Sequence, residues 1–191
     1  MPANWDPAEF HHWHSKLPHG PKGRAWNDLR PDQQKVYREW WAFEKFASVA
    51  PLDVDPRTIE NRKPPEPDIR CRISGKEHYF ELGEVTDKII AQKASEATKR
   101  RQHISGGWFS QLPPLWRIFK QKCSKIYLTS GRPLHLLLYY AVGHQFPHTE
   151  LLREEISKGH QRIVSELQKS PFSSVWLYDQ WDNSVIAYVQ R

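Results

Sequence analysis

Residues 61–85 read NRKPPEPDIRCRISGKEHYFELGEV, and this stretch decides the fold. Three apolar residues within 69–73 alternate with two arginines, which is the pattern of a half-buried β-strand. Ser-Gly-Lys at 74–76 is a turn signal, and 78–85 reads as a second strand. The stretch therefore predicts a β-hairpin.

Three acidic residues, Asp68, Glu81 and Glu84, stand in or beside this hairpin. Antiparallel pairing across a short turn can bring Asp68 and Glu81 within reach of one ion. Strand alternation places Glu84 on the opposite face. Two carboxylates, completed by water and a phosphate oxygen, suit Mg²⁺, and such an ion can orient a water molecule and stabilise charge on a phosphodiester. The other interpretation of these acids is a solvated strand face.

The rest of the chain alternates between helix and strand patterns. A helix is predicted over 31–48, followed by an extended Pro-rich connector over 51–67. The order favours one α/β domain over 31–191, with a mixed sheet flanked by helices, preceded by an irregular arm over 1–30. Beyond the hairpin the patterns predict helices over 86–104, about 114–127 and 149–169, a buried strand in the apolar run 132–142, and two strands within 173–191.

Positive charge is concentrated in one part of the chain. The whole chain carries +6, whereas residues 86–132 contain ten basic and two acidic residues, a local charge of +8. Concentrated positive charge attracts polyphosphate, so this segment favours contact with nucleic acid, although two solvated basic helix faces would give the same pattern.

Several other classes of protein find no support. The two cysteines lack metal-ligand spacing, and no phosphate-binding glycine loop or nucleophile elbow is present. No apolar run reaches the length of a membrane span, and the first residues do not resemble a signal peptide, so a cytoplasmic protein without a membrane partner is expected. His135 is expected to be a packed or hydrogen-bonded core residue, and the histidine-bearing arm is not expected to bind metal.

Pro67-Asp68 followed by Glu81-Leu82-Gly83 in a second strand resembles the PD-(D/E)xK nuclease superfamily, which has the restriction-endonuclease-like fold. The resemblance covers roughly residues 31–140. It implies that Asp68 and Glu81 bind Mg²⁺ or Mn²⁺ and that a lysine positions or activates the attacking water. It also implies a further acidic ligand from the preceding helix, for which Glu44 is preferred over Glu39.

The chain departs from this family at one position, because Gly83 stands where the motif lysine is expected. The resemblance allows a lysine that has moved to the next helix, and Lys93 or Lys88 is expected to contact the phosphate or the water. A lost lysine would instead leave a degenerate site that binds without cutting.

The first hypothesis is therefore a metal-dependent endonuclease, a hydrolase acting on DNA rather than RNA. The second is a nuclease-like fold without activity that serves as a nucleic-acid-binding or protein-complex subunit, and a protein partner or a second copy of the chain stays open. The third is a protein whose acids face solvent and whose basic helices meet an acidic partner. The residues expected to bind nucleic acid are Lys99, Arg100, Arg101, Trp108, Arg117, Lys120 and Lys122.

Overall fold

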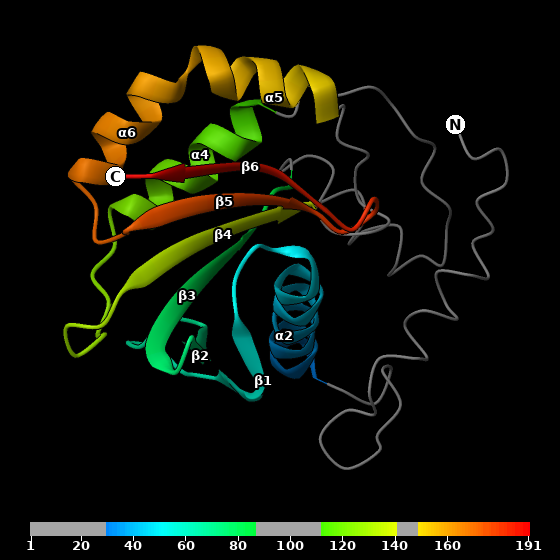
Figure 1. The fold of residues 1–191 in the computed structure, drawn as a ribbon, viewed down its shortest axis with the longest axis vertical. Helices are drawn as coiled ribbons and strands as arrows, with labels where there is room; N and C mark the ends of the chain where they lie inside the picture. The colour runs from blue at the N-terminus through cyan, green and yellow to red at the C-terminus, as the bar shows by residue number, and fades with distance from the viewer. Residues whose placement is uncertain (1–29, 87–111, 141–148) are drawn as a thin grey trace, which may run out of the picture.

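The computed structural model describes residues 30–86, 112–140 and 149–191, which form a six-stranded mixed sheet with helices on both faces (Figure 1). The prediction of an α/β fold with a mixed sheet is confirmed. Residues 1–29 of the expected arm lie outside the described part of the chain. The elements, in chain order, are α2 (Pro31–Val49), β1 (Val54–Asn61), β2 (Ile69–Ile73), β3 (Lys76–Glu84), α4 (Leu112–Cys123), β4 (Leu134–Tyr140), α5 (Thr149–Lys158), α6 (His160–Gln168), β5 (Ser174–Asp179) and β6 (Ser184–Gln190).

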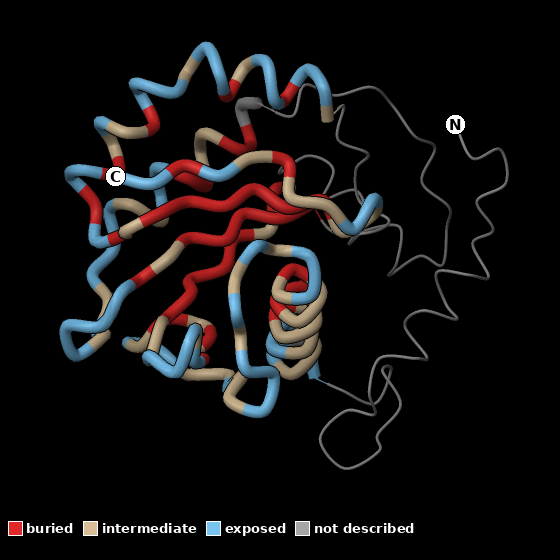
Figure 2. The backbone as a smooth tube through the Cα atoms, in the orientation of Figure 1, coloured by how far each residue is buried: buried red, intermediate tan, exposed pale blue. Residues whose placement is uncertain are grey.

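The strands lie in the sheet in the same order as in the chain. β2 pairs antiparallel with β1 and with β3, whereas β3, β4 and β5 run parallel, and β6 returns antiparallel to β5. β4 is therefore an interior strand, as its apolar sequence predicts, and nearly all of its residues are buried (Figure 2).

The predicted hairpin is β2–β3, and its turn is tighter than the sequence suggested. Ile73 pairs with Lys76, so the turn consists of Ser74 and Gly75 alone. Both have positive φ, 47° and 78°, which is the geometry of a type I′ turn and matches the twist of the flanking strands. This turn fixes the register of the two strands and with it the pairing of residues further along.

Helices cover the two faces of the sheet separately (Figure 1). α2 packs Ala42, Phe43 and Phe46 on one face, where a cluster of aromatic rings joins them to the sheet. On the other face α4, α5 and α6 share a second core of aliphatic side chains, including Leu115 and Ile163. The sheet therefore separates two cores. Because side chains along a strand point alternately to the two faces, each one belongs to the core on the face to which it points.

The expected connector over 51–67 is wrong over residues 54–61, because these form β1. The prolines of this segment argued against a strand, and yet one of them, Pro56, lies inside β1. The strand tolerates it because β1 is at the edge of the sheet and its pairing with β2 is interrupted between Asp55 and Glu60. An edge strand does not need every backbone amide for pairing.

The helix expected over 149–169 is two helices, α5 and α6, which meet at Gly159. A side chain at this position would approach the Glu155 carbonyl oxygen to 3.2 Å and the Trp116 ring to 3.4 Å. Glycine thus allows the junction to pass close to α4. The helix expected over 114–127 ends at Cys123. Among the helices in the described ranges, none has the length and apolar character that crossing a membrane requires.

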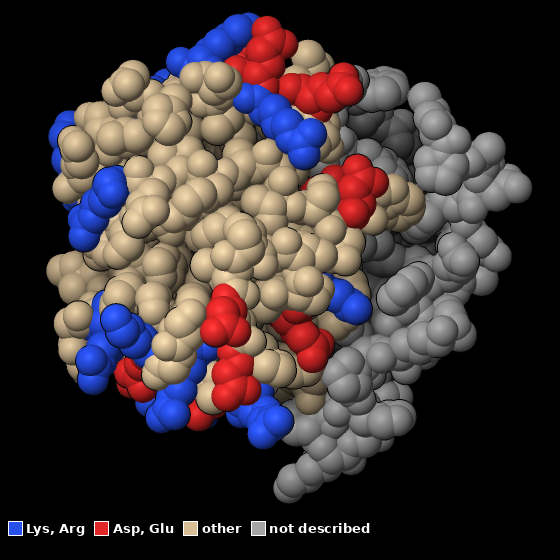
Figure 3. Space-filling model, in the orientation of Figure 1, with Lys and Arg blue, Asp and Glu red and all other residues tan. Residues whose placement is uncertain are grey.

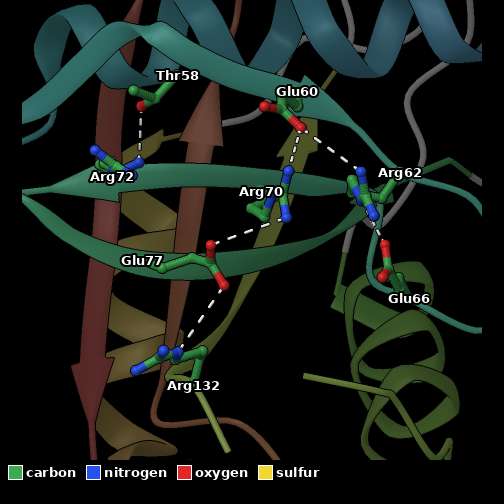
Figure 4. Close-up of polar contacts among 8 residues, drawn as sticks. All are labelled: Thr58, Glu60, Arg62, Glu66, Arg70, Arg72, Glu77 and Arg132. Carbon is green, nitrogen blue, oxygen red and sulfur yellow. Dashed lines mark hydrogen bonds and ion pairs between the residues drawn. The ribbon is translucent and has the colours of Figure 1, made fainter. Parts of the chain in front are cut away.

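Charged side chains form a network over β1, β2 and the loop before β4 (Figure 4). Arg70 contacts Glu60 at 2.6 Å and Glu77 at 3.9 Å, and Arg132 contacts Glu77 at 3.9 Å. Arg62 joins Glu60 at 3.6 Å. Figure 3 shows side chains of both signs gathered along the lower edge of the molecule. Most of these arginines are thus neutralised locally by glutamates.

Asp179, at the end of β5, provides a test of the described packing. It is 1% exposed, and burial raises its pKa to about 6. Because the folded pKa lies above the unfolded value, the stability contributed by this group is greatest near pH 4 and falls as the pH rises to about 6. Asp179→Asn removes the buried charge and keeps an acceptor for the Trp181 amide, which lies 2.8 Å from Oδ1.

We therefore expect Asp179→Asn to raise the free energy of unfolding at pH 8 by about 1–3 kcal/mol, and to give no gain at pH 4. Urea denaturation at the two pH values measures the difference. Glu150→Gln, at an exposed position on α5, is the control and should change little. Equal stability of Asp179→Asn and the unmutated protein at pH 8 would contradict the buried charge.

Candidate active site

The β2–β3 hairpin brings Asp68 and Glu81 together. Ile69 pairs with Phe80, so the next step along the ladder places Asp68 opposite Glu81. The backbone amide of Leu82 donates a hydrogen bond to Oδ2 of Asp68 at 2.8 Å. This bond orients the Asp68 carboxylate toward β3, and the two predicted metal ligands form a cross-strand pair.

Glu81 is only 5% exposed, and its environment opposes ionisation. Burial raises the pKa of Glu81, and the neighbouring Asp68 carboxylate raises it further. The Lys122 ammonium acts in the opposite direction. A buried carboxylate beside a second one is costly unless a cation lies close to both.

Lys122, from α4, is that cation. Its Nζ lies 2.6 Å from Oε1 of Glu81 and 4.0 Å from Oδ2 of Asp68. The sequence suggested Lys122 only as a nucleic-acid contact, and assigned the site lysine to the segment directly after β3. In the structure a lysine from a later helix reaches the carboxylate pair.

Gly83 explains how α4 can come so close. A Cβ atom at position 83 would lie 2.8 Å from Cδ2 of Leu138, 2.9 Å from Cγ2 of Ile118 and 3.7 Å from Cε of Lys122. The space of a side chain at 83 is therefore filled by its neighbours, and the Lys122 stem passes beside it. The glycine at the motif position and the lysine on α4 are two parts of one packing arrangement.

Of the two acidic candidates on α2, Glu39 is the one that interacts with Asp68, and the preference for Glu44 stays a prediction. Glu39 is buried, and its Oε1 lies 3.2 Å from Nζ of Lys35. Burial raises the pKa of Glu39 to about 7, the Asp68 charge adds to this, and Lys35 opposes it. Glu44 is five positions further along, about 140° around the helix, and is half-buried.

A cleft of about 390 Å³ lies between α2, β3 and α4; Lys122 lines it, whereas Asp68 and Glu81 do not. Its volume is within the range of small-ligand pockets. Within the described residues its charged lining is mostly basic, and the side-chain Nε of Arg38 in its wall is buried without a hydrogen-bond partner. An anion fits this lining better than a cation does. The charged residues of the cleft are Lys35, Arg38, Glu39, Glu84, Arg117 and Lys122.

Only some of the other predicted site residues lie in the described part of the chain. Arg117 donates a hydrogen bond to the Thr86 carbonyl at 2.9 Å and lines the cleft, and Lys120 is exposed on α4. Glu84 lies on the face opposite Glu81, as alternation predicts, and contacts Thr86. The predicted residues that lie outside the described part of the chain are Lys88, Lys93, Lys99, Arg100, Arg101 and Trp108.

His135 is part of a hydrogen-bonded chain across the sheet. Its Nε2 lies 2.9 Å from Nδ1 of His78, and its Nδ1 lies 2.8 Å from Oγ of Ser174. Burial, and to a lesser extent the neighbouring His78, lower the pKa of His135 to about 4. The side chain is thus a neutral, hydrogen-bonded residue of the core, which agrees with the sequence-based interpretation.

No protein-family model, curated protein or solved structure matches this chain. The described residues also contain no group of three or more His, Cys, Asp or Glu side chains arranged to hold a metal ion. What the structure assembles is a pair of carboxylates, one lysine and a basic cleft.

Proposed function

We propose that this chain is a metal-dependent nuclease with a restriction-endonuclease-like fold, and that it hydrolyses phosphodiester bonds in DNA. Asp68 and Glu81 bind the metal ion, and Lys122 takes the role of the motif lysine. One observation supports the proposal: the Lys122 ammonium lies 2.6 Å from the Glu81 carboxylate, and the Lys122 stem passes beside Gly83.

The donor atoms present fit Mg²⁺ or Mn²⁺. Both carboxylates supply hard oxygen ligands, and Mg²⁺ is commonly held by only one or two carboxylates, with water and substrate phosphate completing its shell. The absence of a third acidic ligand among the described residues is therefore compatible with Mg²⁺. The bound ion would supply a water of lowered pKa and neutralise charge on the phosphate.

Other groups of the chain would orient the metal ligand, stabilise charge and bind the substrate phosphates. The Leu82 amide fixes the Asp68 carboxylate, so one ligand is already oriented before substrate binds. Lys122 would stabilise negative charge that develops on the phosphate or hold the attacking water. The basic lining of the cleft, with Arg38 and Arg117, holds the neighbouring phosphates.

A second function is favoured by the same ion pair. Lys122 already neutralises Glu81 at 2.6 Å, and Lys35 neutralises Glu39 at 3.2 Å, so the buried acids are stable without a metal ion. A fold of this kind can serve as a nucleic-acid-binding or protein-complex subunit without cutting.

A cleavage assay separates the two functions. Purified protein is incubated with plasmid and with single-stranded DNA in Mg²⁺, in Mn²⁺ and in EDTA, and Asp68→Asn is the control against a contaminating nuclease. The nuclease predicts cutting that requires the metal and falls to background in the variant. If DNA is bound but is not cut with either metal, the binding function replaces the nuclease.

A further inference from the structure

Four exposed apolar residues lie together beside the carboxylate pair: Pro64, Pro65, Ile126 and Leu128. Ile126 is 91% exposed and Leu128 is 58% exposed, and both prolines are exposed. The backbone amide of Leu128 donates to the Pro65 carbonyl at 3.1 Å, which joins the two segments. We refer to these four residues as the apolar ridge.

Inward packing of the Tyr127 side chain directs its two neighbours, Ile126 and Leu128, toward solvent. Its ring packs on Phe172 with 5.5 Å between centroids, and its hydroxyl donates to the Lys122 carbonyl at 3.3 Å. Neighbouring side chains on an extended segment point to opposite sides. Because Tyr127 points inward, Ile126 and Leu128 point to solvent.

The ridge is next to the carboxylate pair. Pro65 is three residues before Asp68 in the chain. The Tyr127 hydroxyl donates to the carbonyl of Lys122, whose Nζ lies 2.6 Å from Oε1 of Glu81. Ile126 and Leu128, on either side of Tyr127, therefore lie near the pair.

Two exposed lysines flank the ridge in the chain, Lys63 before Pro64 and Lys125 before Ile126. Residues 112–140 contain five Lys and Arg residues and no Asp or Glu. Single exposed apolar residues are common on proteins, but four together on a basic surface are not. A partner that fits must combine anionic groups with apolar faces.

Nucleic acid with unpaired bases has both properties, whereas a paired duplex hides its base faces. Apolar side chains such as Ile, Leu and Pro contact base faces in several classes of DNA-binding protein by unstacking the paired duplex, and a segment that is already unpaired does not carry this unstacking cost. We propose that the apolar ridge contacts unpaired bases next to the carboxylate pair, so that the preferred substrate is single-stranded nucleic acid or a duplex with an unpaired segment. This inference rests on the proposed function, because it takes nucleic acid as the ligand of the neighbouring site.

The test measures binding without cleavage. Fluorescence anisotropy in EDTA compares a labelled single strand, the fully paired duplex and a duplex with a central mismatched bubble. Ile126→Ser is expected to weaken binding to the single strand and the bubble by about tenfold, and binding to the paired duplex by less than about twofold. Leu151→Ser, at a 55% exposed position on α5, is the matched control and should change neither.

A second variant separates base contact from charge. Lys125→Met should weaken binding to all three ligands alike, because its contact is with the backbone. The proposal is overturned if Ile126→Ser has no effect or affects the three ligands equally. It is also overturned if the unmutated protein binds anionic lipid vesicles through Ile126 and shows no preference among the nucleic acids.

The outcome is independent of the cleavage assay. Binding that prefers unpaired bases and depends on Ile126 supports the ridge even if no metal restores cutting, which would reject the nuclease alone. Metal-dependent cutting with no preference for unpaired DNA and no effect of Ile126→Ser would reject the ridge alone.

Discussion

Replacing Lys122 with methionine is expected to slow metal-dependent cleavage by about 10²–10⁴-fold, which is the range for loss of a positioned proton-transfer or charge-stabilising group. Methionine keeps much of the apolar stem that passes beside Gly83 but carries no charge. Single-turnover cleavage with excess protein measures the rate. Lys120→Met, at an exposed position on the same helix, is the control and should retain most of the activity.

The same substitution should also destabilise the fold at neutral pH. Asp68 and Glu81 would lose their shared cation, and breaking one partner from a buried pair costs about 3 kcal/mol. Without Lys122 the folded pKa of Glu81 rises further above its unfolded value. The loss is therefore largest at neutral pH and disappears as the pH falls and Glu81 becomes protonated.

Metal ions should replace the missing charge. If Asp68 and Glu81 bind Mg²⁺, excess Mg²⁺ should restore stability to Lys122→Met more than it stabilises the unmutated protein. Urea denaturation with Mg²⁺ and with EDTA measures both effects. Full cleavage activity of Lys122→Met would remove Lys122 from the proposed site, and stability insensitive to Mg²⁺ would argue against the metal.

Gly83→Lys, which restores the motif lysine in its expected position, should damage the protein. The new Cβ would lie 2.8 Å from Leu138 and 2.9 Å from Ile118, and overpacking of this kind costs about 1–3 kcal/mol. The added ammonium would also compete with Lys122 for the same carboxylates. We expect a total loss of about 3 kcal/mol or more in the free energy of unfolding, without a gain in cleavage.

Two further variants separate packing from charge. Gly83→Ala carries only the packing cost, so it should be intermediate in urea denaturation. Combining Gly83→Lys with Ile118→Ala removes one of the two close neighbours, and the double variant should lose less than the sum of the single variants. A Gly83→Lys protein as stable as the unmutated one would show that α4 does not pack against β3 at this position.

The parts of the fold that could be predicted from sequence are those set by local patterns. Alternation and a Ser-Gly turn fixed the β2–β3 hairpin, and a continuous apolar run identified β4. β1 was missed because Pro56 is tolerated only at a sheet edge, and edge position depends on the whole topology. The helix junction at Gly159 depends on contact with Trp116, which is distant in sequence.

The residues of the candidate site also fall into those that local sequence patterns reveal and those that depend on the tertiary fold. Asp68 and Glu81 could be found because one hairpin places both. Glu39 could have been found too, since it shares the i, i+3, i+4 and i+7 stripe of α2 with Ala42, Phe43 and Phe46, and an acid on an apolar stripe is unusual. Lys122 could not be found, because its position depends on how α4 docks forty-one residues after Glu81.

The difference between a local pair and a distant lysine has a consequence for the order of folding. A two-residue turn closes the hairpin with a small loss of chain entropy, whereas docking of α4 closes a much longer loop. We therefore expect the two carboxylates to meet early in folding, before Lys122 is in place. Docking of α4 would then relieve the repulsion between them, so the assembly of the site would itself favour the step that joins the helix to the sheet.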